Sequence, residues 1–320
     1  MKKFFIAIVA LAAAVACSND DIISIDRQAI GFGNPFVENA TRATDPSYSN
    51  SNNLIREFKV WGDVTGNAGA SSNILLYNGT RVYTEDSATP VYGEAYKCDQ
   101  TEYWIPSATY NFVAIANATS VTPATGFPET ISYTANGETD LIYTKVGETV
   151  TTDDKAVPSQ NPVAFTFNHL LSKVHFNFTN TSSSNLFTFD ITDIQISGAY
   201  ASGVYTIGAA TPWAATGSTT FNFGSATGVT TTTSQTSTDA RLIIPGEQTW
   251  KVSFTRKTYY NGNLMSTDSY TGDDAYTLNY TFVENGAYVI NVELSAGLPI
   301  DFSVGSLGGW DEKTPSITIP

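Results

Sequence analysis

The stretch FTFNHLLSKVHFNF, residues 165–178, gives the strongest indication of the fold. Apolar and polar residues alternate on both sides of a short break, which is the pattern of half-buried β-strands. One strand is predicted to end near Phe167 and the next to begin at Lys173, because the intervening NHLLSK has room for one turn at most. The residues predicted to face a core from the second strand are Val174, Phe176 and Phe178. This stretch therefore predicts a boundary between two β-rich parts.

The same alternation recurs along the chain, for example in YVINVEL, residues 288–294. Further predicted strands are EFKVWG (57–62), YNFVAIA (110–116), LIYTKV (141–146), RLIIP (241–245) and KVSFTR (251–256). Asn-Gly pairs, which favour tight hairpin turns, begin at positions 78, 136, 261 and 285. No long amphipathic helix stands out, so the predicted class is all-β. Each part is long enough for a β-sandwich of about seven to nine strands.

The composition argues against several kinds of partner. The 320-residue chain has a formal net charge of −14 and no cluster of Lys and Arg outside its extreme N-terminus. Nothing in it could neutralise a row of phosphates, so we expect no nucleic-acid partner. Aromatic residues make up 12% of the chain, which is too many for a disordered protein and suits β-sandwiches with polar outer faces.

No catalytic or metal-binding motif stands out. The chain has no phosphate-binding loop, no dinucleotide fingerprint, no HExxH and no G-x-S-x-G. Asp268, Asp273 and Asp274 lack the spacing of a calcium loop and are interpreted as a solvated acidic turn. His169 and His175 have no acidic partner nearby in the sequence and are interpreted as structural. We therefore expect no enzymatic activity, no cofactor and no metal. Paired carboxylates for glycoside hydrolysis stay open in so acidic a chain, but no spacing in the sequence singles them out.

The N-terminus has the features of an export signal. Two lysines precede the apolar stretch FFIAIVALAAAVA, residues 4–16, which is too short for a convincing transmembrane span. The following Cys17 resembles the lipidated cysteine of a lipobox, although Ala14 stands where leucine is usual. Residues 1–17 are therefore predicted to be a lipoprotein signal peptide. The alternative is a plain secretory signal with an incidental cysteine.

The residues after Cys17, SNDD, resemble the sorting signals of surface-exposed outer-membrane lipoproteins. If Cys17 is lipidated, Cys98 has no partner for an intrachain disulfide. We interpret Cys98 as a small buried hydrophobe.

Arg42 is an isolated long cation in ENATRATDPSYSN, residues 38–50, among small, polar and turn-forming neighbours. A salt bridge on a solvated loop is the ordinary explanation for such an arginine. The alternative is that another protein recognises it.

An ordered set of motifs resembles the fimbrillin family, the subunits of type V pili. The set consists of the lipobox with its acidic follow-on, TRAT, FKVWG, YWIPSATYNFVAIAN, FNHLLSKVHFNF, ISGAYASGVY and a late GGWDE. The resemblance covers almost the whole chain. It implies two transthyretin-like (Greek-key type) β-sandwich domains in tandem and a lipoprotein precursor. It also implies cleavage by an arginine-specific extracellular protease, followed by polymerisation through strand exchange.

Applied to this chain, the resemblance makes Arg42 the cleaved residue and Ala43 the first residue of the mature protein. Residues 18–42 would then be a propeptide that supplies a strand around AIGFGNPFV, residues 29–37. Its removal would expose unpaired backbone groups and an apolar groove until a neighbour's strand fills the place. A head-to-tail contact of this kind gives an open filament.

The donor strand is predicted within Pro299–Pro320, because apolar residues alternate up to the end of the chain, where most monomers are frayed and polar. The residues assigned to it are Ile300, Phe302, Val304, Trp310, Ile317 and Ile319. The alternative is that they form the last strands of the C-terminal domain. Both interpretations apply if the strand pairs within its own subunit in the monomer and moves to the next subunit on assembly. The expected domains are an N-terminal sandwich over 43–168 and a C-terminal sandwich with the donor strand over 169–320.

The expected function is that of a pilin, located in the outer membrane as a precursor and then in a surface fimbria that supports adhesion. Its expected partners are other copies of itself and related pilins, the arginine-specific protease, and the outer membrane through the lipid anchor before cleavage. One alternative is a surface-exposed glycan-binding lipoprotein, which should keep its N-terminal segment tethered. The other is a fimbrial tip adhesin, which has no need of a C-terminal donor strand.

Overall fold

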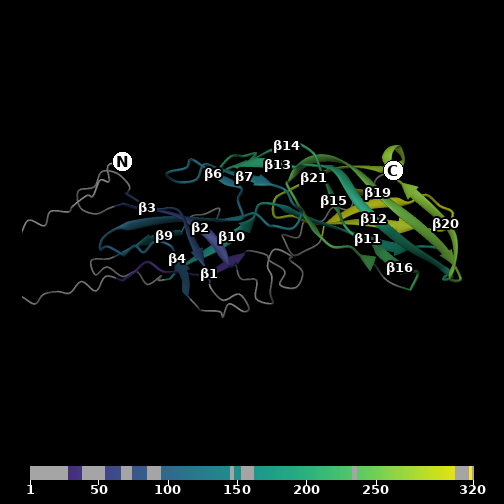
Figure 1. Cartoon of the computed structure of the whole chain (residues 1–320), viewed down its shortest axis with the longest axis horizontal. Helices are drawn as coiled ribbons and strands as arrows, with labels where there is room; N and C mark the ends of the chain where they lie inside the picture. The colour runs from purple at the N-terminus through teal and green to yellow at the C-terminus, as the bar shows by residue number, and fades with distance from the viewer. Residues whose placement is uncertain are drawn as a thin grey trace, which may run out of the picture.

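The structure is a computed structural model, and it describes residues 28–37, 55–65, 74–84, 95–144, 148–152, 162–232, 236–306 and 317–318. These residues form β-strands joined by turns, with one 3₁₀ turn at Gly272–Asp274. The predicted all-β class is confirmed. Figure 1 shows an elongated molecule, with the first strands of the chain at one end and strands of its C-terminal half at the other. The described residues include no helix long and apolar enough to cross a membrane.

One sheet at the N-terminal end closes on itself, and we call it the closed sheet. Its strands are β1 (Phe32–Val37), β2 (Glu57–Thr65), β3 (Ile74–Tyr83), β4 (Ala95–Cys98), β5 (Thr109–Ala116), β8 (Ile142–Tyr143), β9 (Glu148–Thr151) and β10 (Val163–His169). They follow the order β2-β3-β4-β1-β10-β8-β5-β9, and β2 also pairs with β5. Closure encloses an aromatic core that includes the fully buried Tyr110 and Phe112.

Two sheets form a sandwich at the C-terminal end. One contains β11 (Ser172–Asn180), β17 (Thr236–Ser237), β18 (Arg241–Ile243), β22 (Ala287–Leu294), β23 (Asp301–Ser306) and β24 (Ile317–Thr318). The other contains β12 (Phe187–Ala199), β15 (Thr219–Asn222), β16 (Ala226–Thr230), β19 (Gly246–Tyr260), β20 (Asn263–Tyr270) and β21 (Tyr276–Phe282). Both sheets contribute to one apolar core, as sandwich packing requires. Val174, Phe176 and Phe178 lie in this core, so their predicted burial is confirmed.

A fourth sheet joins the two ends, and we call it the bridging sheet. Its strands, in the order β14-β13-β7-β6, are β6 (Ser120–Thr122), β7 (Thr130–Thr134), β13 (Ser202–Thr206) and β14 (Trp213–Thr216). Strands β7 and β13 pair across the predicted boundary, with Thr130 opposite Thr206. The bridging sheet was not predicted. The division into domains 43–168 and 169–320, with Greek-key connections, stays a prediction.

The break predicted within residues 165–178 lies close to the observed one, since β10 ends at His169 and β11 begins at Ser172. Leu170 and Leu171 between them are fully buried in a third core, which contains residues from both halves of the chain. The boundary is therefore a packed joint. Cys98 is half-buried against the core of the closed sheet, and burial raises the pKa of its thiol.

Replacing Phe176 with alanine is expected to lower the free energy of unfolding by about 3–5 kcal/mol. Its ring is fully buried and meets Phe223 edge-on at 4.9 Å between centroids, so truncation leaves a cavity. Urea denaturation measures the loss. Thr179→Ala, a change at a half-buried residue on the same strand, is the control, with an expected loss of about 1 kcal/mol or less. Equal losses would show that Phe176 has no core role.

Candidate functional site

Strand β1 is held in the closed sheet from both sides. It runs parallel to β10, with Phe32 opposite Val163, and antiparallel to β4, where Phe32 lies opposite Tyr96. The fit is close, because a Cβ added at Gly33 would lie 2.9 Å from Cγ of Pro162. Among the described strands, only β1 pairs with both β4 and β10. Without it the ring of the closed sheet opens there.

Phe32 is the apolar anchor of β1. The residue is 1% exposed, and its ring centroid lies 5.3 Å from Tyr77, 5.8 Å from Phe112 and 5.9 Å from Phe165. Burying a phenylalanine side chain is worth about 1.5–3 kcal/mol, and aromatic pairs at such distances add to it. Ile30, just before β1, is also buried in this core.

The residues around β1 are buried. Burial raises the pKa of Tyr96 to about 12, and it also raises the pKa of Tyr77 above its ordinary value, with a smaller effect from Cys98. The Tyr96 hydroxyl donates a hydrogen bond to the Ile55 carbonyl. A slot left by β1 would therefore expose apolar aromatic surface to water and leave backbone groups without hydrogen-bond partners. Both cost free energy.

Cys17, Arg42 and Ala43 lie outside the described residues, as do Trp310 and Ile319. Their roles stay predictions. The strand expected within the propeptide is present as β1, which precedes Arg42 in the chain.

Three of the proposed donor residues lie in the C-terminal core. Ile300, Phe302 and Val304 are all buried, and the ring of Phe302 lies 4.6 Å from that of Tyr276. Strand β23 pairs with β22 along its whole length. These residues therefore form part of the last strands of the C-terminal sandwich, which is the arrangement given above as the alternative. A donor role for them in the assembled state stays a prediction.

The described pairing of β24 is short. Strand β24 lies at the end of its sheet and pairs with β23 at two positions, Thr318 with Ser303 and Ile317 with Val304. A backbone hydrogen bond contributes about 0.5–1.5 kcal/mol net to stability. A pairing at two positions therefore contributes little stability. Releasing β23 would expose its buried side chains Phe302 and Val304.

The structure does not bring the two candidate strands together. Strand β1 lies in the closed sheet, whereas β24 lies at the edge of a C-terminal sheet. Strand β1 begins near the outer N-terminal end, where Ala29 bridges Tyr103, and runs inward beside β10. Strand β24 is antiparallel to β23 and therefore runs outward like β11 and β22. The last strand points away from the β1 position of its own chain.

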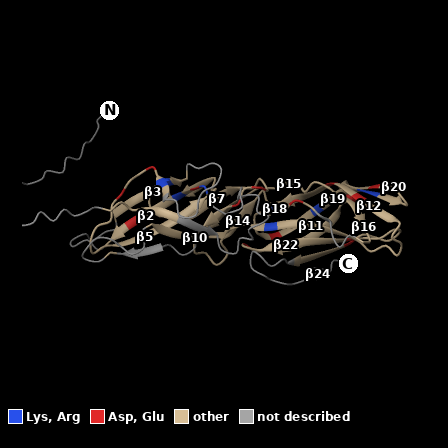
Figure 2. Ribbon diagram, turned by 90° about the horizontal axis from the view of Figure 1, so that it is seen from below, with Lys and Arg blue, Asp and Glu red and all other residues tan. Residues whose placement is uncertain are grey.

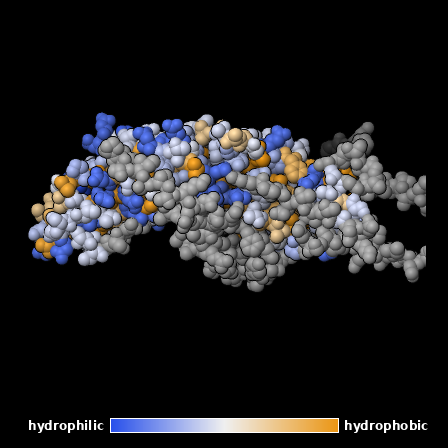
Figure 3. Space-filling model, turned by 180° about the vertical axis from the view of Figure 1, so that it is seen from behind, coloured by the Kyte–Doolittle hydropathy of each residue, from blue (hydrophilic) through white to orange (hydrophobic). Residues whose placement is uncertain are grey.

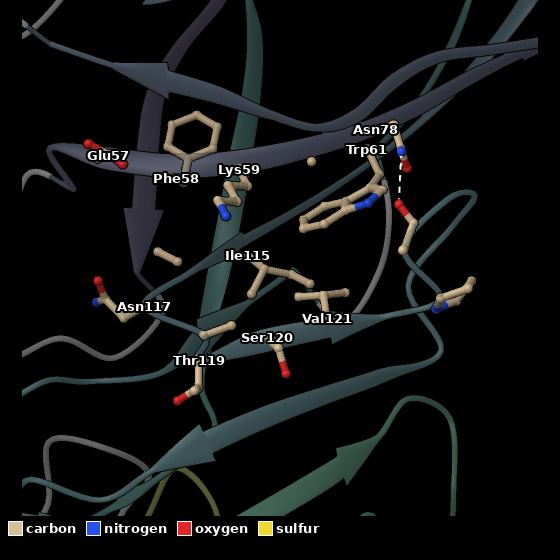
Figure 4. Close-up of a pocket in the computed structure, with 15 residues that line it drawn as sticks. Glu57, Phe58, Lys59, Trp61, Asn78, Ile115, Asn117, Thr119, Ser120 and Val121 are labelled. Carbon is tan, nitrogen blue, oxygen red and sulfur yellow. Dashed lines mark hydrogen bonds between the residues drawn. The ribbon is translucent and has the colours of Figure 1, made fainter.

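A pocket of about 390 Å³ lies beside β2 and β6. In Figure 4, Trp61 and Asn78 border it, and Asn78 donates a hydrogen bond to the Ala124 carbonyl over 3.0 Å. Glu57, also at its rim, is paired with Arg81 at 2.8 Å. Trp61 is 4% exposed, so its ring offers little surface for a sugar to stack on. These polar groups at the pocket already have partners within the protein, and its tryptophan is buried. The pocket is therefore interpreted as structural, and it does not favour the glycan-binding alternative.

His169 forms a buried pair with Asp140. The Nδ1 of His169 donates to Oδ2 of Asp140, and neither side chain is exposed. The pair links the end of β10 to the segment before β8, and it supports the structural interpretation of His169. Sequence reasoning missed Asp140, which is separated from it by 29 positions. His175 is half-buried, and burial, aided by Lys173, lowers the pKa of its ring.

Replacing His169 with alanine is expected to destabilise the protein by about 3–5 kcal/mol, because it removes one partner of a buried ionisable pair and leaves the other. Thermal or urea unfolding measures the loss. His175→Ala is the matched control, with an expected loss of about 1 kcal/mol. The double variant His169→Ala/Asp140→Ala should lose less than the sum of the single variants. Additive losses would show that the pair is not coupled.

Charged residues are dispersed over the described strands. Figure 2 shows Lys and Arg interspersed with Asp and Glu and no continuous basic strip. Asp268 lies in β20 and pairs with Arg256 at 3.0 Å, so it is not part of a solvated turn as interpreted above. Asp273 and Asp274 do lie exposed, in the 3₁₀ turn. The part of the chain that the structure describes contains no group of three His, Cys, Asp or Glu placed to hold a metal.

Solved structures share this architecture. A fimbrial protein from Bacteroides vulgatus superposes with a TM-score of 0.56 at 14% identity, covering 89% of this chain and 100% of that one. A candidate cell adhesion protein from Bacteroides uniformis gives a TM-score of 0.50 at 14% identity, covering 90% and 99%. At such identities the likeness shows a common fold. No curated protein sequence matches the chain.

The sequence itself defines the family. Residues 41–299 match the model of the fimbrillin-like family. Because the match spans most of the chain, the protein belongs to the fimbrillin-like family. The resemblance inferred from the ordered motifs is confirmed.

Proposed function

We propose that this chain is a structural subunit of a cell-surface fimbria. It is exported as an outer-membrane lipoprotein through Cys17, cleaved after Arg42 and polymerised by β-strand exchange. The observation that supports this best is β1, a strand encoded before Arg42 that fills a slot between β4 and β10. Membership of the fimbrillin-like family supports assembly with other pilin subunits and a place at the cell surface.

Cleavage after Arg42 cuts the covalent link between β1 and the rest of the chain. Strand β1 is then held by non-covalent contacts, which include its backbone pairings and the burial of Ile30 and Phe32, and its departure opens the slot. A strand from a neighbour restores both the pairings and the buried aromatic contacts. This is β-augmentation, in which main-chain hydrogen bonds give affinity and side-chain pockets fix the register.

The directions of the strands suit a head-to-tail filament. Strand β24 runs outward at the C-terminal end, and the β1 slot opens at the N-terminal end. The end of one copy therefore points toward the slot of the next, and such a heterologous contact does not close into a ring. Related pilins with the same slot would join the filament, which would support adhesion from the cell surface.

The surface-released protein is expected to begin at Ala43, because an arginine-specific extracellular protease would cut the preceding bond. N-terminal sequencing or mass spectrometry of protein sheared from cells measures this directly. The membrane fraction of the same cells should retain the form that begins at lipidated Cys17. Finding lipidated Cys17 as the sole N-terminus of released protein would remove the assembly step. That result would favour the tethered glycan-binding lipoprotein.

A further inference from the structure

The outer end of the C-terminal sandwich, which we call the C pole, carries exposed apolar side chains. Its tip is the turn between β19 and β20, where the Asn261 amide donates to the Leu186 carbonyl over 2.9 Å. The turn between β22 and β23 lies at the same end, because Asn180, opposite Leu294, donates to the Phe187 carbonyl over 2.9 Å. The exposed residues here are Leu186 (41%), Tyr260 (40%), Leu264 (56%), Met265 (64%) and Leu298 (62%).

The opposite end of the molecule, which we call the N pole, carries a smaller group. Strand β3 begins there, and the Gln100 side chain donates a hydrogen bond to the Leu76 carbonyl over 2.8 Å. This hydrogen bond places the segment that begins at Gln100 beside the start of β3. The exposed residues are Ile74 (52%), Leu75 (40%) and Tyr103 (46%). Because Ala29 bridges Tyr103 just before β1, the mouth of the β1 slot lies at this pole.

Between the poles, the described residues include fewer large exposed apolar side chains than the C pole does. Among the described residues, Val204 and Val283 are the large apolar ones exposed there, at 38% and 41%. Val204 lies in the bridging sheet, and Val283 accepts a hydrogen bond from Ser172 near the joint. Figure 3 shows hydrophobic residues at the extreme end on the left, which is the C pole in that view, and also singly over the middle of that face. Exposed apolar residues on a monomer are normally scattered singly, so the five at the C pole and the three at the N pole make these two ends candidate contact surfaces.

We propose that the C pole of one copy packs against the N pole of the next, as an apolar contact separate from the exchanged strand. This inference rests on the proposed function, because head-to-tail strand exchange brings these poles together. The two surfaces differ in their residues, so the contact is heterologous and repeats along a filament. Met265, the most exposed of these side chains, is unbranched and adapts its shape to a partner surface.

The pole contact gives polymerisation a net driving force. Strand exchange replaces β1 by another strand in the same slot, so the backbone pairings lost and regained are similar in number. The pole contact has no counterpart in the monomer, and its burial of apolar surface occurs in the filament alone. It also excludes water from the place where the donor strand crosses between copies, as a rim of packed contacts does around the core of an interface.

The test replaces both tip residues in the full chain, as Leu264→Ser/Met265→Ser, and compares filament yield from cells by electron microscopy and by quantifying sheared protein. The yield is expected to fall about tenfold or more, since about 1.4 kcal/mol per contact already changes an equilibrium tenfold. Unfolding temperature and cleavage at Arg42 should not change, because both side chains are exposed in the monomer. Val204→Ser, an equivalent change away from the poles, is the control and should assemble like wild type.

A photo-cross-linking amino acid at position 264 locates the contact. Adducts with residues near Ile74 or Tyr103 of a second copy are expected, and a cross-linker at position 204 should give none there. Wild-type filament yield from the double serine variant, or adducts confined to other sites, would overturn the pole contact while leaving strand exchange standing. Absence of filaments from the wild-type chain would overturn the proposed function and this inference with it.

Discussion

Replacing Arg42 with alanine is expected to abolish filament formation and to leave the protein in the outer membrane as a lipidated monomer. Without the cut, β1 stays covalently attached and remains between β4 and β10, where Phe32 is buried among three aromatic rings. An intramolecular strand competes at a high effective concentration with any strand from a neighbour. Electron microscopy of cells and immunoblotting of membrane and sheared fractions measure the two outcomes.

Two companion variants make the experiment specific. Arg42→Lys should be cut poorly, because a lysine ammonium lacks the planar fork that a bidentate specificity pocket binds. Arg27→Ala removes another arginine of the propeptide and should assemble normally. Normal filaments from Arg42→Ala would show that cleavage at this bond is not required, and assembly would then need another trigger.

Deleting residues 311–320 is expected to give a protein that folds and is cut after Arg42 but cannot polymerise with itself. The deletion removes β24, which pairs with β23 at two positions, and leaves the buried Phe302 and Val304 in place. The loss of stability should therefore be small. Assembly should fail because, in the proposed function, the deleted end supplies the strand that enters the next copy.

The truncated chain also offers a positive test. It keeps its own slot, so it should accept the end of a wild-type copy and terminate growth. Co-expression with wild type should therefore shorten filaments in proportion to the truncated fraction, as measured by electron microscopy. Wild-type filament yield from the truncated chain alone would exclude these residues as the donor. Failure of the truncated chain to fold would favour a purely structural role for the C-terminal strands.

The parts of the fold that could be predicted from the sequence are those that depend on local patterns of apolar and polar residues. Alternation is visible within a single strand, so the buried face formed by Val174, Phe176 and Phe178 could be predicted without knowing what it packs against. The break between β10 and β11 was predictable for the same reason, because NHLLSK interrupts two alternating runs. Family resemblance supplied the expectation that the propeptide contributes a strand.

The parts that were missed depend on contacts between distant segments. Nothing near His169 indicates Asp140 as its buried partner, because their proximity depends on how β8 and β10 pair. The bridging sheet joins Thr130 to Thr206, and short strands such as β6 and β14 have no distinctive pattern of their own. Asp268 was grouped with neighbours in sequence, whereas its partner Arg256 lies across a hairpin.

The bridging sheet stiffens the joint between the two ends of the molecule. Hydrogen bonds between β7 and β13 cross the joint, and Leu170 and Leu171 fill the core there, so a pull on one pole is transmitted through a sheet to the other. Packed protein interiors have low compressibility and transmit strain. In the proposed filament, bending would therefore be concentrated where one copy meets the next. Its bending stiffness would then be set by the junctions between subunits, and softening the pole contact would give curled filaments from straight, unaltered building blocks.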